Sequence, residues 1–128
     1  TSMAAPHVAG FAALLMQGDL AGARQSFAAV PFPDGKLAGL AIVAQREGKQ
    51  AEAEGYLRKL VALRGDDSAY RQAQVLAQWG RRDKALAAIE LAFRIRDSNL
   101  TGLGQDPLFD PLRGTPQFRA MKQRMGFD

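Results

Sequence analysis

The chain has 128 residues, of which 47% are apolar and 23% charged, and its formal net charge is +4 at pH 7. These proportions fit a single globular domain and exclude a disordered chain. The absence of cysteine excludes disulfides and thiolate metal sites. Because no apolar run approaches about 18 residues, we also expect no membrane span.

The first part of the chain predicts two short helices joined by a turn. Pro6 suits the first turn of a helix that continues through Val8 to Met16. Gly18 is expected to stop this helix, and Asp19 to cap the next one. The apolar side of the second helix consists of Ala23, Phe27 and Val30, and the prolines of Pro31-Phe32-Pro33 end it.

The middle of the chain, Lys36 to Leu63, repeats this pattern around Gly48. Its first helix carries an apolar stripe with i, i+3, i+4, i+7 spacing, made of Leu37, Leu40, Ala41 and Ala44. Gly48 closes that helix, because the C-terminal cap needs a left-handed residue. The second helix carries Ala53, Leu57 and Leu60 and ends at Gly65. Neither helix can bury its stripe alone, so the two are predicted to form a helical hairpin.

A third pair of helices is predicted after Gly65. The run Asp66-Asp67-Ser68 supplies a capped start for a helix from about Ala69 to Trp79, and Trp79 is expected to fill the core. Gly80 turns the chain. The partner helix, lined by Ala85, Ile89 and Ala92, is expected to end near Asp97.

Landmarks of the three pairs recur at a nearly constant interval. The turn glycines Gly18, Gly48 and Gly80 lie 30 and 32 residues apart, and an alanine follows five residues after each. A large apolar residue stands four residues after each alanine. This pattern resembles tetratricopeptide (TPR) repeats, which have a period of about 34 residues. The resemblance implies an all-α fold of three antiparallel hairpins (about 6–33, 34–65 and 66–97) in a right-handed superhelix within one domain, 1–128.

The segment 98–128 differs from the repeats. Its glycines and Asp-Pro pairs predict an irregular stretch, and Thr115-Pro116 predicts the start of a last helix. Phe118, Met121 and Met125 give that helix an apolar stripe, suited to cap the exposed face of the repeat array. The string from Asp106 to Arg113 resembles the tail that follows repeats in bacterial multidomain regulators, which implies a C-terminal module of such a protein.

The TPR resemblance also implies a concave groove lined by the first helix of each hairpin. Carried over position by position, the groove consists of Val8, Ala12, Ile42, Gln45, Arg46, Tyr70, Gln74 and Gln78. Such a groove suits an extended segment or an amphipathic helix of a protein partner. Packing of the same residues against a neighbouring domain of the parent chain is the alternative that stays open.

A separate motif stands at the start of the chain. Thr1 to Gly10 resembles the nucleophile segment of subtilisin-like serine proteases, with Ser2 as the matching nucleophile. No segment resembles the family's aspartate or catalytic histidine motifs, and a serine without its base is not activated. His7 is the only histidine. We therefore expect no enzyme, with a C-terminal fragment of a subtilisin-like hydrolase as the alternative.

Positive charge gathers in the C-terminal half, which makes nucleic-acid binding a second alternative. Those arginines and lysines alternate with acidic residues, so an ordinary solvated surface is favoured and no nucleic-acid partner is expected. We expect neither a cofactor nor a metal, and a cytoplasmic location with the periplasm left open. The function favoured is a protein–protein interaction scaffold.

Overall fold

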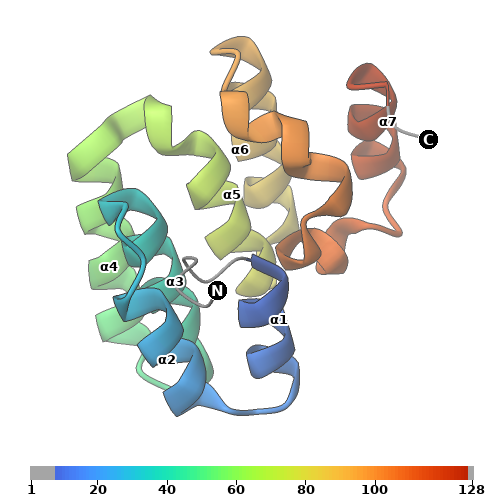
Figure 1. Cartoon of the computed structure of the whole chain (residues 1–128). Helices are drawn as coiled ribbons and strands as arrows, with labels where there is room; N and C mark the ends of the chain where they lie inside the picture. Colours follow the sequence, from blue (N-terminus) through green and yellow to red (C-terminus); the bar gives the residue numbers. More distant parts are fainter. Residues whose placement is uncertain (1–7, 127–128) are drawn as a thin grey trace.

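The computed structural model describes the backbone of residues 8–126 and the side chains of 11–126. This part of the chain is built from helices and contains no strand (Figure 1), so the predicted all-α class is confirmed. Its first six helices are α1 (Val8–Met16), α2 (Leu20–Ala28), α3 (Pro33–Arg46), α4 (Gln50–Arg64), α5 (Ala69–Gln78) and α6 (Arg82–Arg94). They pack as successive pairs: α1 with α2, α3 with α4, and α5 with α6.

One turn geometry joins the two helices of every pair. Gly18, Gly48 and Gly80 have φ of 78°, 81° and 81°, the left-handed region that glycine adopts without steric cost. Each glycine N–H donates to the carbonyl three residues earlier, at 3.0–3.1 Å. The next N–H reaches the carbonyl five residues before it, at 2.9–3.0 Å. This is a Schellman cap, so the predicted glycine stops are confirmed.

Small residues let the paired helices approach closely. The alanines five residues after each turn glycine, Ala23, Ala53 and Ala85, are fully buried. Further along α4 and α6, Leu60 and Ala92 are also buried. Val30, which was predicted to line α2, lies beyond the end of that helix at Ala28 and is only half-buried. The three alanines therefore share one buried environment. Val30, by contrast, does not share the environment of Leu60 and Ala92.

The start of the third pair differs from the prediction. Residues Gly65–Ser68 form a 3₁₀ helix, η1, in place of a capped loop. The Ser68 hydroxyl donates to the Gly65 carbonyl at 2.6 Å, so it does not cap α5. The predicted cap from the run Asp66-Asp67-Ser68 is wrong, because no side chain caps α5 and the Ser68 hydroxyl closes its own 3₁₀ turn.

The C-terminal segment is more regular than its glycines and prolines suggest. It forms η2 (Ser98–Gln105) and η3 (Pro107–Leu112), and then α7 (Pro116–Arg124). Thr115 caps α7 as predicted, since its hydroxyl accepts the Phe118 N–H at 3.2 Å. Phe118 and Met121 are buried in one apolar cluster with Ile89 of α6. The apolar stripe of α7 thus covers the outer side of the third pair.

Two apolar clusters form the core and meet at α5. One cluster joins α5, α6 and α7 to η2 and η3, and the other joins α1, α2 and α3 to parts of α4 and α5. Trp79 packs against both clusters and donates its indole N–H to the Ala41 carbonyl at 3.2 Å. Trp79 therefore serves the core, as predicted. None of the helices in the described part is long and apolar enough to cross a membrane.

Candidate functional site

The residues predicted to line a groove lie on the inner faces of α1, α3 and α5. The side chain of Val8 lies outside the described residues. Of the others, Gln45 and Gln78 are half-buried and Arg46 is exposed, whereas the remaining four, Ala12, Ile42, Tyr70 and Gln74, are buried. The inner face is thus largely covered, and the covering element belongs to the same chain.

That element is η3, which sits against α1 and α5 (Figure 1). At its start, the carboxylate of Asp106 accepts two hydrogen bonds at 2.7 Å, from the Tyr70 hydroxyl and from the Gln74 amide. It also accepts the Leu108 N–H at 3.0 Å, which caps η3. One buried carboxylate therefore fixes the C-terminal segment to the inner face of α5.

The contact continues along α5. Gln78 donates to the Leu108 carbonyl at 2.8 Å, and Arg46 of the preceding pair donates to the Gln78 side chain at 2.5 Å. Burial, followed by the charge of Asp106, raises the pKa of the Tyr70 hydroxyl. Tyr70, Gln74 and Gln78 are thus engaged in hydrogen bonds within the chain itself.

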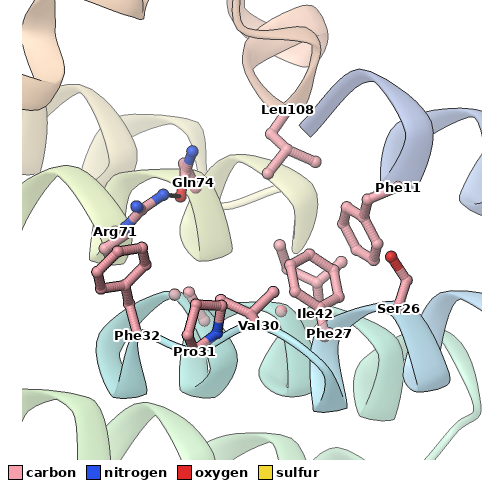
Figure 2. Close-up of a pocket in the computed structure, with 13 residues that line it drawn as sticks. Phe11, Ser26, Phe27, Val30, Pro31, Phe32, Ile42, Arg71, Gln74 and Leu108 are labelled. Atoms are coloured by element: carbon pink, nitrogen blue, oxygen red, sulfur yellow. Dashed lines mark hydrogen bonds between the residues drawn. The ribbon is translucent and has the colours of Figure 1, made fainter. Parts of the chain in front are cut away.

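An open pocket lies beside this inner face, between the first and second pairs. It has a volume of about 230 Å³, and α1, α2, α3, α5 and η3 all contribute to its walls. Most of the lining is apolar, including Phe11, Phe27, Val30, Ile42 and Leu108 (Figure 2). Of the predicted groove residues whose side chains the structure describes, only Ile42 and Gln74 reach this pocket.

Of two glycines on α3, one explains why the pocket is hollow. Gly35 and Gly39 stand one helical turn apart and both line the cavity. The ring of Phe27 lies directly over Gly39, in the space that a Cβ atom would occupy. At Gly35 a Cβ would meet only Val30 Cγ1 at 3.4 Å and the Arg71 side chain at 3.9 Å. The missing side chain at Gly35 therefore leaves free volume.

Phe32 stands at the rim of the pocket with 63% of its surface exposed. Its backbone is extended, with φ of −96° and ψ of 121°, as expected for a residue that precedes a proline. Pro33 then begins α3, where its missing N–H costs nothing. The Pro31-Phe32-Pro33 string thus ends α2 as predicted and also presents an aromatic ring to solvent.

Polar groups lie at both ends of the pocket. Figure 2 shows Ser26 near Phe11 at one end and Arg71 with Gln74 at the other. Arg71 Nη1 donates to Gln74 Oε1 at 3.2 Å, whereas Nε is buried without an acceptor among the described residues. The nearest carboxylate oxygen, on Asp34, is 3.9 Å from Nε, too far for a hydrogen bond. This lining offers apolar contact, one hydroxyl and guanidinium donors.

Several of the C-terminal arginines are engaged in ion pairs. Arg124 donates to both carboxylate oxygens of Glu90 at 2.9 Å, and Arg113 pairs with Asp110 at 2.6 Å. Ser2 and His7, the residues of the protease-like motif, lie outside the described residues. The described residues contain no group of three or more His, Cys, Asp or Glu side chains placed to hold a metal ion.

Comparison with protein-family models, with curated proteins and with solved structures finds no match. The pocket itself had one signal in the sequence: two glycines at i, i+4 on one helix, directly after a Pro-Phe-Pro string. The spacing of apolar residues does not reveal the pocket, because glycine has no side chain to contribute to that pattern.

Proposed function

We propose that this chain is a protein–protein interaction module of the TPR-like class, working within or between subunits of a larger bacterial regulator. Three helix pairs with one turn geometry and a spacing of 30 and 32 residues support the class. The tail from Asp106 to Arg113, similar to tails of bacterial regulators, supports the context. A right-handed superhelical course of the pairs belongs to the same proposal.

The observation that carries the proposal is the pocket between the first two pairs. Its lining is mainly apolar, and Phe32 remains 63% exposed at its rim. A large apolar side chain exposed to water beside an apolar concavity is typical of docking sites. The pocket stays open beside the inner face, although Leu108 of the C-terminal segment forms part of its wall. We therefore assign partner docking to this pocket in place of the longer groove predicted from the sequence.

A peptide-display selection on the immobilised chain tests this function, with Gly35→Leu as the matched variant. The new side chain is expected to fill the pocket without distorting α3, because its Cβ has room and leucine favours helix more than glycine does. We expect peptides with a shared apolar residue that bind the wild-type chain and lose binding to Gly35→Leu. Failure to enrich any sequence, or equal binding to both proteins, would contradict the proposal.

A further inference from the structure

The pocket's size and walls define what enters it, given the docking function proposed above. Its volume of about 230 Å³ is below the roughly 300–1,000 Å³ of pockets for drug-sized ligands. A cavity of about 150 Å³ already accepts benzene. One large apolar side chain therefore suits the pocket, and the rings of Phe11, Phe27 and Phe32 favour an aromatic one.

The guanidinium of Arg71 defines the polar part of the ligand. Arg71 Nη2 lies next to the space left by Gly35, 3.9 Å from where a Cβ would stand. Only Nη1 of this guanidinium donates a hydrogen bond within the described residues, to Gln74. A ligand that fills the space at Gly35 thus meets an unused donor of a charged group, and such donors form strong hydrogen bonds.

The charge around Arg71 decides which acceptor fits. The Asp34 carboxylate, at 3.9 Å from Nε, already places one negative charge beside the guanidinium. A carboxylate ligand would add a second negative charge within a few ångströms of Asp34, and like charges that close destabilise each other. A neutral carbonyl supplies an acceptor for the unused Nη2 donor without this repulsion.

We propose that the pocket binds a peptide segment of a partner protein through one aromatic side chain, and that the backbone carbonyl of this residue or its neighbour accepts a hydrogen bond from Arg71. The aromatic ring replaces water against Val30 and Ile42, and the carbonyl lies at the Arg71 end of the pocket (Figure 2). The recognition element is thus an apolar side chain attached to a neutral peptide group, with no requirement for an acidic residue.

Three probes that share one ring test this inference by ¹⁵N NMR titration of the full 128-residue chain. They are N-acetyl-phenylalaninamide (ring and neutral carbonyls), N-acetyl-phenylalanine at pH 7 (ring and carboxylate) and ethylbenzene (ring alone). We expect the amide to shift the Arg71 Nε–H signal and to bind at least about 10-fold more tightly than ethylbenzene. The carboxylate probe is expected to bind no more tightly than the amide.

Two variants complete the test. Arg71→Met should weaken the amide probe about 10-fold and leave ethylbenzene unchanged, and Gly35→Leu should abolish binding of both. Tighter binding of the carboxylate probe, or equal binding of amide and ethylbenzene, would overturn the carbonyl contact and leave apolar docking intact. Absence of binding by every probe would overturn docking as well. If the NMR signals of the pocket residues shift with protein concentration in the absence of any probe, a second copy of the chain occupies the pocket. That result would also overturn the proposal.

Discussion

Replacing Asp106 by alanine is expected to loosen the C-terminal segment from the inner face of α5. The Asp106 carboxylate accepts hydrogen bonds from the Tyr70 hydroxyl, the Gln74 amide and the Leu108 N–H, at 2.7, 2.7 and 3.0 Å. Gln74 is 1% exposed and Tyr70 is 3% exposed. The alanine variant therefore leaves two buried donors without their acceptor.

The size of this effect follows from the hydrogen bonds that the variant loses. Hydrogen bonds to a charged group contribute roughly 1.5–3 kcal/mol each, and an orphaned buried donor costs about 1–3 kcal/mol. The three bonds share one acceptor and are not additive, and the Leu108 N–H lies at a helix start where water can replace the carboxylate. We expect a loss of about 3–5 kcal/mol in the free energy of unfolding. For a domain of this size that corresponds to a fall in Tm of roughly 10–20 °C.

Two further variants separate the buried network from a general effect on the segment. Asp110 lies on the same 3₁₀ helix, is exposed and pairs only with Arg113, so Asp110→Ala should cost less than about 1 kcal/mol. Asp106→Asn should fall between the two alanine variants. Tyr70 and Gln74 share Oδ2, and the Leu108 N–H uses Oδ1. The new amide therefore keeps one oxygen acceptor, but in either orientation its NH₂ group faces a donor.

Urea unfolding followed by circular dichroism and by the fluorescence of Trp79, the only tryptophan, measures these differences. The expected order of stability is wild type, Asp110→Ala, Asp106→Asn and Asp106→Ala. Similar midpoints for the two alanine variants would refute the idea that Asp106 holds the segment in place.

Other substitutions test the packing and the pH dependence. Gly39→Ala should be about 1–3 kcal/mol less stable than Gly55→Ala, because the new methyl group at Gly39 overlaps the half-buried ring of Phe27 and the one at Gly55 meets only the end of an arginine side chain; equal thermal midpoints would contradict this. Ala53→Leu should overfill the contact of α3 with α4 and cost on the order of 1–3 kcal/mol in urea unfolding, since Ala53 is fully buried; an unchanged midpoint would disprove it. The hydrogen bond from Arg24, at 2.6 Å, lowers the pKa of Glu47, so its stabilising effect is present above the unfolded pKa of about 4.3 and is lost as pH falls through the lower, folded value. Arg24→Gln should therefore be less stable than the wild type at pH 7 and similar to it near pH 2, and a difference in stability that does not change with pH would rule out this linkage.

The helices could be predicted from the sequence because their signals are local. Left-handed glycines and the alanine five residues later specify each turn within a few residues, and the structure has them where they were expected. Thr115 likewise specifies its own cap. Ser68 was misjudged because two short-range hydrogen bonds compete for one hydroxyl, and no periodicity decides between a cap and a 3₁₀ turn.

The site was harder to predict because it depends on contacts between distant residues. Tyr70 and Gln74 lie 36 and 32 residues before Asp106, and no local pattern indicates that this carboxylate occupies the face assigned to a partner. The pocket at Gly35 was missed for a different reason. It is a space left by absent side chains next to rings from three other segments, and only the assembled helices show it.

The most direct test of the proposed docking function is the affinity of one selected peptide, measured by isothermal titration calorimetry against the wild-type chain and against Gly35→Leu. We predict a negative heat-capacity change on binding to the wild type, as expected when apolar surface is buried. We also predict loss of measurable binding to the variant, with both proteins unfolding at similar urea concentrations. Equal affinity for the two proteins would show that the partner docks elsewhere and would contradict the assignment of this pocket.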